Sequence, residues 1–220
     1  MNRENTIESR VRASMSKLHE MLSARGIPVD SPTTLEVEYP GEVVKYGENV
    51  VVFTSNRARV NEKDLASHVS ITRENGGTTG IIIVQSPPSE TVTTALAAMS
   101  DVLQIFHAMQ LEFNPTKHRK VPRHRILSAD ESRQYFEKYR IKLDDIVGKM
   151  KADNILLNPD EPPLRQIAMK HKDYLPLPQI ASQDAIARWI GAKPGDLVEI
   201  MRNSETAGGT PYYRICVASV

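Results

Sequence analysis

Apolar residues recur at spacings of three and four near the start of the chain, and they form short continuous runs further along. The first pattern predicts an amphipathic helix over residues 3–25. The runs at residues 49–54 and 80–85 are rich in β-branched side chains and predict buried strands. Asn61 and Ser89 are placed to cap a helix after each strand. This strand–helix–strand–helix order predicts an α/β domain with a small sheet.

The pattern beyond residue 100 is less regular. We expect a strand near Leu111 and Phe113. Ser128 and Glu131 form the signature of a capping box, which predicts a helix after Ser128. Residues 143–178 begin with an amphipathic stretch and then contain five prolines, so we expect the proline-containing part to be mostly extended or looped.

The last forty residues alternate between helix and strand signals. Ser182 is the predicted N-cap of a short helix that ends at Gly191. Strands are expected at residues 197–202 and 210–217, with a polar loop between them. In that loop, Gly208 is expected to adopt a backbone conformation closed to residues that carry a β-carbon.

Composition places the chain among ordinary globular proteins. Its 220 residues are 40% hydrophobic and 25% charged, and its formal net charge is +1. The longest apolar runs have strand length, and the first 25 residues contain no apolar block, so we expect neither a membrane span nor a secretory signal. Residues 1–110 carry ten Lys and Arg against thirteen Asp and Glu, whereas residues 111–220 carry eighteen against fourteen. This asymmetry favours two domains.

The residues that usually carry catalysis are not arranged for it. Six histidines are scattered without metal-ligand spacing, and Cys216 lies within an apolar strand. The glycine-rich residues 76–80 precede a strand, whereas a phosphate-binding loop follows one. Neither of the two clear strands in the first half carries the carboxylates of a metal-dependent nuclease. We therefore predict no catalytic residue, no metal and no cofactor.

Residues 117–125 form a basic segment. They contain five Lys or Arg and two His, and no acidic residue. Such a segment can follow a phosphate backbone. It can equally be a solvated linker or a surface that meets an acidic protein, because charge alone carries little specificity.

Four pieces of the C-terminal half occur in the order of a known family. They are residues 121–124 (Val-Pro-Arg-His), residues 177–180 (Leu-Pro-Gln-Ile), residues 184–191, and residues 193–202 followed by 204–208 and 213–216. Together they resemble the fifth shared subunit of eukaryotic nuclear RNA polymerases, which has a shorter counterpart in the archaeal enzyme. Residues 1–113 resemble the family less closely.

The resemblance implies a two-domain α/β protein. Residues 1–113 would form a jaw domain of nuclease-like fold, with helices around a small mixed sheet and without nuclease chemistry. Residues 114–220 would form a compact α+β assembly domain, interrupted by an insertion at residues 143–176. An insertion of that length is usually functional or flexible, and we interpret it as a surface for another polymerase subunit.

The resemblance also implies a role. The chain would be a non-catalytic subunit of a multisubunit DNA-directed RNA polymerase, without a membrane or small-molecule partner. It would dock on the largest subunit, contact other polymerase subunits, and hold its jaw near downstream duplex DNA. The residues expected to dock are Arg188, Arg202, Ser204, Glu205, Thr206, Gly208, Tyr213 and Arg214. The residues expected to face DNA are Ser89, Thr91, Lys117, Arg119 and Lys120.

Two alternatives remain open. One is a nucleic-acid-binding transcription adaptor that uses residues 117–125, and the other is a nuclease of the jaw-type fold. Residues 89–92 read Ser-Glu-Thr-Val where the family usually has Thr-Pro-Ser-Ala, which puts a DNA contact there in doubt. This departure and the insertion suggest a large DNA virus or a distant protist. The protein would then act in the nucleus if cellular, or in the virion or the viral factory if viral.

Overall fold

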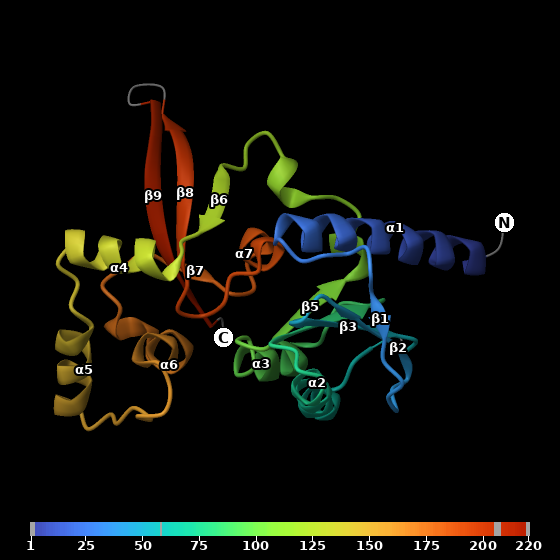
Figure 1. The fold of residues 1–220 in the computed structure, drawn as a ribbon, viewed down its shortest axis with the longest axis horizontal. Coiled ribbons are helices and arrows are strands. Elements are labelled where there is room, and N and C mark those ends of the chain that lie inside the picture. Colours follow the sequence, from blue (N-terminus) through green and yellow to red (C-terminus); the bar gives the residue numbers. More distant parts are fainter. Residues whose placement is uncertain (1–2, 58, 205–207, 219–220) are drawn as a thin grey trace. The chain divides into compact units, whose positions relative to one another are not determined.

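The chain folds into two compact units, each built on its own sheet. The computed structural model describes residues 3–57, 59–204 and 208–218, and the chain passes from the first unit to the second between Asn114 and Pro115. The predicted α/β fold class is confirmed, since both units combine helices with a mixed sheet (Figure 1).

The first unit contains a five-stranded sheet in the order β1-β2-β3-β4-β5. The β1–β2 and β2–β3 pairs are antiparallel, whereas β3, β4 and β5 run parallel to one another and are joined by helices. The strands are β1 (Thr33–Thr34), β2 (Gly41–Tyr46), β3 (Val50–Ser55), β4 (Thr79–Val84) and β5 (Leu103–His107).

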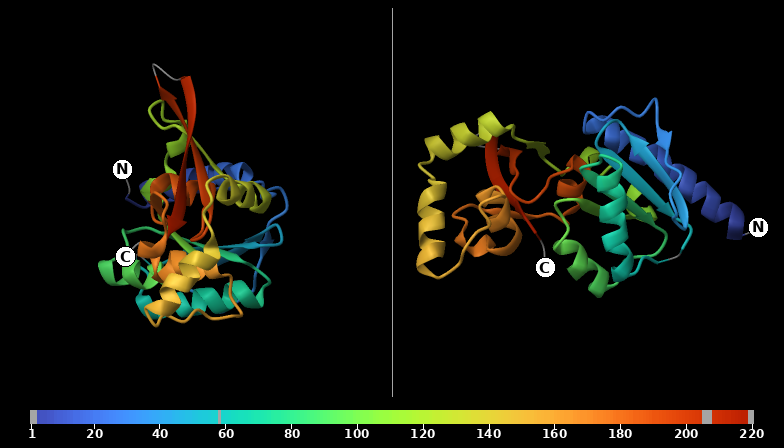
Figure 2. Two further views of the ribbon diagram at one scale, coloured as in Figure 1. Left: turned by 90° about the vertical axis from the view of Figure 1, so that its left-hand side faces the viewer. Right: turned by 60° about the horizontal axis from the view of Figure 1, so that its bottom comes forward.

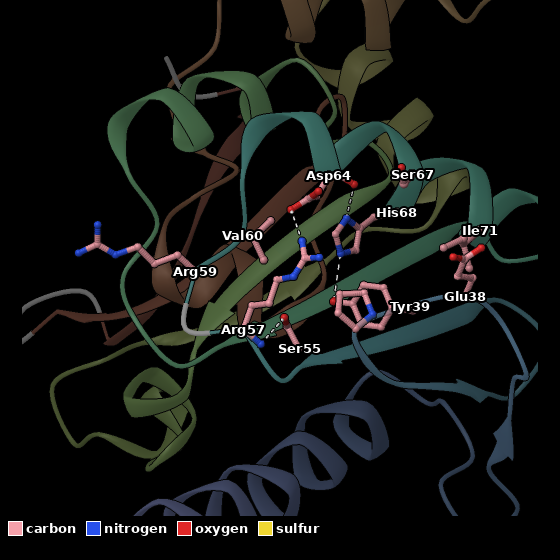
Figure 3. Close-up of a pocket in the computed structure, with 11 residues that line it drawn as sticks. Glu38, Tyr39, Ser55, Arg57, Arg59, Val60, Asp64, Ser67, His68 and Ile71 are labelled. Atoms are coloured by element: carbon pink, nitrogen blue, oxygen red, sulfur yellow. Dashed lines mark hydrogen bonds and ion pairs between the residues drawn. The ribbon is translucent and has the colours of Figure 1, made fainter.

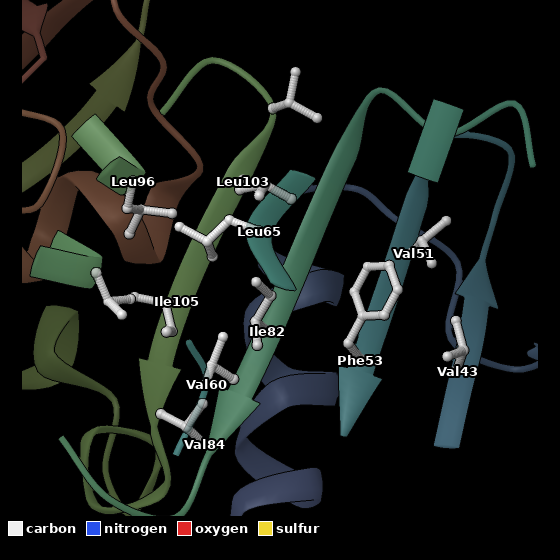
Figure 4. Close-up of a cluster of buried hydrophobic side chains, with 12 residues drawn as sticks. Val43, Val51, Phe53, Val60, Leu65, Ile82, Val84, Leu96, Leu103 and Ile105 are labelled. Carbon is white, nitrogen blue, oxygen red and sulfur yellow. The ribbon is translucent and has the colours of Figure 1, made fainter. Parts of the chain in front are cut away.

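This sheet is covered on both faces, which explains why β3 and β4 are apolar along most of their length. Helices α2 (Glu62–Glu74) and α3 (Glu90–Ala97) pack on one face, and α1 (Arg3–Ala24) lies on the other (Figure 1). Figure 4 shows the core under α2 and α3, where Phe53, Ile82 and Ile105 lie side by side on adjacent strands.

The helices of the first unit begin where the sequence predicts. Asn61 precedes α2 and its side chain takes part in a capping box with Asp64. Ser89 caps α3, because its hydroxyl accepts a hydrogen bond from the backbone N–H of Val92. The predicted first helix and both predicted strands are confirmed, with bounds that differ by at most one residue.

The second unit contains a four-stranded sheet in the order β6-β8-β9-β7. Strands β8 and β9 form a long antiparallel hairpin, and β6 and β7 flank only its lower part (Figure 2). The strands are β6 (Arg123–Ile126), β7 (Gln179–Ala181), β8 (Leu197–Ser204) and β9 (Gly208–Val217).

Helices cover both faces of this second sheet and create two small cores. One core contains Leu197 and Ile215 together with side chains of α5 and α6, and the other contains Val198 and Cys216 together with side chains of α7. The helices are α4 (Ala129–Lys138), α5 (Leu143–Ala152), α6 (Pro163–Lys170) and α7 (Ala185–Ile190). Short 3₁₀ turns are η1 (Ala108–Leu111) in the first unit, and η2 (Pro115–Lys117) and η3 (Lys172–Tyr174) in the second.

Two expectations for the first unit are wrong. The chain around Leu111 is a 3₁₀ turn, and Phe113 is 61% exposed, so the strand lies earlier, at β5. The prolines at positions 32 and 40 predict a loop between the first helix and β3, where the structure has strand β2. Pairing with β3 makes it a strand all the same.

Two expectations for the second unit also need correction. The proline-rich part of residues 143–178 contains helix α6, because Pro162 is its N-cap and Pro163 its first residue, a position where proline is well tolerated. The helix expected to begin at Ser182 begins instead after Asp184, whose carboxylate accepts hydrogen bonds from the N–H groups of Ile186 and Ala187. Its predicted end is confirmed, since Gly191 has a φ of 81°.

Candidate functional site

The end of the β8–β9 hairpin extends beyond the rest of its sheet. Strand β6 pairs with β8 only as far as Met201, and β7 pairs with β9 only from Ile215 onward. Residues 202–204 and 208–210 therefore pair only with each other. A two-stranded ribbon without further support is marginally stable in water. Figure 1 shows the ribbon standing clear of the other elements of its unit.

One face of this hairpin presents a tyrosine between two arginines. The guanidinium carbon of Arg202 lies 4.3 Å from the ring centroid of Tyr212, and that of Arg214 lies 5.5 Å from it. Arg214 also donates a 3.2 Å hydrogen bond to the backbone oxygen of Gln179. A ring between two cations is held in place by cation–π attraction. The result is an ordered aromatic and cationic surface.

The opposite face carries an ion-pair cluster centred on Glu199. Arg125 contacts Glu199 at 3.1 Å and Glu131 at 2.7 Å, and the hydroxyl of Tyr213 donates to Glu199 at 3.3 Å. Hydrogen bonds, first from the backbone of Ser128 and then from Arg125, lower the pKa of Glu131. The hydrogen bonds to Glu131 and Glu199 raise the pKa of Arg125. Two carboxylates face the single guanidinium of Arg125, so its positive charge is fully compensated and the three side chains together carry a net charge of −1.

The predicted docking residues do not all lie together. Arg202 and Arg214 share one face of the hairpin with Gly208, whereas Tyr213 lies on the other face. Gly208 has the expected positive φ, 65°. The backbone of Ser204 ends β8, while Glu205 and Thr206 lie outside the described residues.

Arg188 stands apart from this group, because it lies on α7 and is only 8% exposed. Burial lowers its pKa. In the isolated unit its side chain therefore lies inside the fold and not on the outer surface of the hairpin.

Sequence reasoning missed Tyr212, the residue between the two arginines. The signal was available in principle, because residues 212 and 214 lie on the same face of any strand. The contact with Arg202 depends on the register, which pairs Arg202 with Thr210 and Ile200 with Tyr212. Unless the register is known, the sequence does not show which of Tyr212 and Tyr213 lies on the face of Arg202.

The basic segment is divided by its structure. Lys117, Arg119 and Lys120 are exposed, the first of them in turn η2. Arg123 is exposed on β6, an edge strand of the sheet. Arg125 is compensated by the carboxylates of Glu131 and Glu199. The exposed cations of this segment are therefore concentrated in its first part and on the sheet edge.

The two predicted DNA-facing residues of the first unit lie together at the start of α3. The hydroxyls of Ser89 and Thr91 are 2.8 Å apart, and Ser89 also caps the helix. Both side chains are exposed, and so is Glu90 between them. The surface is polar but includes a negative charge.

Other chemistry is sparse in the part of the chain that the structure describes. Burial raises the pKa of the Cys216 thiol to about 12, so it remains protonated at neutral pH. Among the described residues, no three His, Cys, Asp or Glu side chains gather as metal ligands. None of the described helices combines the length and the apolar character needed to cross a membrane.

Comparison with known proteins identifies relatives for this fold. The sequence model of the family "RNA polymerase Rpb5, C-terminal domain" matches residues 157–216, which include α6, α7 and most of the hairpin. The subunit rpabc1 of DNA-directed RNA polymerases I, II and III from Dictyostelium discoideum is 27% identical over 216 residues, covering 90% of this chain and 92% of the relative.

Archaeal relatives are more similar over a shorter length. Subunit Rpo5 of the DNA-directed RNA polymerase from Pyrococcus abyssi is 39% identical over 106 residues, covering 48% of this chain and 92% of the relative. Rpo5 from Thermococcus kodakarensis is 36% identical over 110 residues, covering 50% and 96%. These relatives confirm the predicted resemblance. The chain belongs to the Rpb5/Rpo5 family of non-catalytic subunits of DNA-directed RNA polymerases.

Proposed function

We propose that the second unit docks on the largest subunit of a DNA-directed RNA polymerase through the face of the hairpin that carries Tyr212. The observation that carries this proposal is the ribbon of residues 202–204 and 208–210, which no other strand described in its unit supports. Tyr and Arg are enriched among the residues that dominate binding energy at protein interfaces. An ordered Arg–Tyr–Arg face can supply such residues when a partner covers it.

Docking also accounts for the rest of the hairpin. The cores that contain Leu197, Val198 and Ile215 hold its lower part within the unit. The Glu199 cluster fixes the face opposite Tyr212, so that the ribbon leaves the core in one orientation. A rigid attachment lowers the entropy lost on binding.

Affinity purification tests the docking proposal. The full-length protein, tagged at its N-terminus and purified from its native cells, should recover the largest polymerase subunits in equal amounts. The double variant Arg202→Ala/Tyr212→Ala should lower that recovery by about tenfold or more, as expected for central interface residues. Arg133→Ala, on the exposed surface of α4, is the matched control and should recover the polymerase normally.

Two further readouts make the outcome decisive. Trp189 is the single tryptophan and is 2% exposed, so its fluorescence reports whether the second unit of each variant is folded. Normal recovery by a folded double variant would contradict docking through this face. Recovery of the chain without polymerase subunits would favour a free nucleic-acid-binding adaptor.

We further propose that the first unit acts as a jaw beside downstream duplex DNA. Support comes from the relative of Dictyostelium discoideum, whose alignment covers 90% of this chain. A photoreactive residue at Thr91 should crosslink to downstream DNA in a transcribing complex, whereas one at Glu74, exposed at the end of α2, should not. Equal crosslinking from both positions, or from neither, would contradict this placement. The protein would act where its polymerase acts, in the nucleus of a cell or in the virion or viral factory of a virus.

A second candidate function is a free nucleic-acid-binding adaptor. The observation in its favour is the exposed cationic group of Lys117, Arg119 and Lys120. If this group binds DNA in the isolated protein, the affinity should fall steeply with salt concentration. Changing the three residues to Gln should then abolish that binding.

A further inference from the structure

The first unit contains a cavity of about 480 Å³ that the docking proposal does not use (Figure 3). It is formed by the loop before β2, the carboxyl end of β3 and one side of α2. This volume lies within the range of pockets that bind small ligands or side chains. Its position also follows a general rule, because open α/β sheets bind ligands beyond the carboxyl ends of their parallel strands.

Two of the residues that line the cavity, Tyr39 and His68, pack against the buried ring of Phe53. The ring of His68 lies 4.8 Å from that of Phe53 and 5.3 Å from that of Tyr39. His68 is 2% exposed, and its two ring nitrogens contact the backbone oxygen of Asp64 and the hydroxyl of Tyr39. Burial lowers the pKa of His68, which leaves the ring neutral at pH 7. The rings of Tyr39 and His68 are therefore uncharged and held in place by their contacts.

The loop that carries Tyr39 is held against β3. The backbone N–H of Asn56 donates to the oxygen of Pro40 at 3.0 Å, and a β-carbon on Gly41 would lie 2.1 Å from the oxygen of Thr54. Only glycine permits this close approach. The cavity is thus a formed feature of the fold and not a gap between loosely packed segments.

Arg57 brings a cation into the cavity. Figure 3 shows its guanidinium beside Asp64 and His68, whereas Arg59 points away. The carboxylate oxygen of Asp64 is 3.7 Å from the nearest guanidinium nitrogen, which is too long for a hydrogen bond. That oxygen also accepts a 3.3 Å bond from the backbone N–H of Asn61. A guanidinium has five N–H donors, so Arg57 retains the capacity to bind a second carboxylate through two parallel bonds.

The charges around the cavity restrict the kind of ligand. Arg57 and Arg59 are balanced by Glu38 and Asp64, so the lining has no net charge. A polyanion such as duplex DNA gains little electrostatic attraction from a lining without net charge. A peptide segment fits better, because it offers one carboxylate, neighbouring N–H donors and an apolar side chain.

We propose that this cavity binds a short acidic peptide segment of a partner protein. The carboxylate of a Glu or Asp in that segment is held by Arg57, and an adjacent apolar side chain packs on Tyr39 and Ile71. The site lies in the first unit and is independent of the hairpin that we assign to polymerase assembly.

Titration of the full-length protein with a synthetic peptide tests the site. The probe is Gly-Ser-Gly-Leu-Glu-Leu-Gly-Ser with blocked ends, and binding is followed by NMR through the signals of the Arg57 Nε–H group and the Tyr39 ring. The Glu peptide should bind about tenfold more tightly than the same peptide with Gln, because a charge-assisted pair replaces a neutral one. The peptide with Lys should not bind.

Two variants locate the effect. Arg57→Gln should weaken binding of the Glu peptide by about tenfold, while Arg57→Lys, which keeps the charge but loses the planar fork, should fall between Gln and Arg. Arg73→Gln is the matched control, since Arg73 is exposed at the far end of α2 and does not line the cavity. An unchanged backbone NMR spectrum outside the cavity verifies that each variant is folded.

Several results would overturn the proposal. One is the absence of saturable shifts at Arg57 and Tyr39, and another is equal binding of the Glu and Gln peptides. Displacement of the peptide by duplex DNA in an Arg57-dependent manner would assign the site to nucleic acid. Concentration-dependent self-association that Arg57→Gln abolishes would assign it to a second copy of this chain. These outcomes leave the docking proposal untouched, because that proposal is tested on the other unit.

Discussion

The two sheets of this protein differ in how fully their own unit covers them. In the first unit, helices lie on both faces and β3 is buried along nearly all of its length. In the second unit, helices cover only the lower part of the hairpin, and Arg202 and Thr210 near its end are exposed. The first arrangement makes a self-sufficient platform with a pocket at its edge. The second leaves backbone and side chains at the end of the hairpin exposed, which is the surface that we propose a partner covers.

Truncation of the first core should have the largest effect on stability. Phe53 is 0% exposed and contacts both Tyr39 and His68. Phe53→Ala should lower the free energy of unfolding by about 3–5 kcal/mol, because it removes apolar contacts and leaves a cavity. Amide hydrogen exchange in β3 and β4 measures the loss. Phe113→Ala, at a position that is 61% exposed, is the control and should change exchange little.

Adding a single β-carbon at Gly41 in the first unit should have the next largest effect on stability. Gly41 has a φ of 150°, and its added β-carbon would lie 2.1 Å from the oxygen of Thr54. Gly41→Ala should therefore cost about 2–4 kcal/mol, since the β2–β3 pairing must shift in addition to the backbone strain. Chemical denaturation of the variant and the wild type provides the measurement. If Gly41→Ala lowered the free energy of unfolding less than Gly208→Ala, the loop before β2 would be able to shift at little energetic cost.

The same substitution in the second unit should cost less. Gly208 has a φ of 65°, but a β-carbon there would meet no atom within 4 Å. Gly208→Ala should therefore add only backbone strain, about 1 kcal/mol. Faster exchange should be confined to amides near the end of the hairpin. Destabilisation of the whole unit, seen in the fluorescence of Trp189, would contradict the view that this ribbon contributes little to the fold.

Lowering the pH should have the smallest effect on stability, and we expect this effect in the first unit through protonation of His68. Because burial lowers its pKa below the ordinary 6.5, the unfolded chain takes up a proton before the folded chain does. The stability contributed by neutral His68 is fully present above pH 6.5 and is lost as the pH falls toward the lowered value. Unfolding midpoints in urea, measured across this range, should decline in the wild type. His68→Gln should remove that part of the decline, and an unchanged slope would assign it to other groups.

Local signals in the sequence were sufficient to predict the ends of several helices. Ser128 and Glu131 form the predicted capping box, and Gly191 ends α7 in the left-handed conformation that glycine favours. These features depend on residues within one helical turn, so no distant contact is needed to create them. The motifs of the C-terminal half likewise identified the family, because their order along the chain is itself the signal.

Other elements depended on partners far along the chain. Residues 41–46 are a strand because they pair with β3, although Pro32 and Pro40 predict a loop in this part of the chain. Residues 163–170 are a helix in which Ile167 and Ala168 are fully buried against the second core, although prolines precede them. In both cases the burial of apolar surface outweighs a local preference.

The two candidate sites show the same limit of prediction from sequence, because their central contacts depend on the tertiary structure. Arg202 meets Tyr212 because the hairpin register places them diagonally on one face, and a shift of one residue would present Tyr213 instead. Tyr39 meets His68 because β2, β3 and α2 converge, although 29 residues separate them. Helix ends follow from neighbouring residues, and family membership follows from the order of motifs along the chain. Contacts between charged and aromatic groups follow from pairing and packing, since these bring distant segments within a few ångströms.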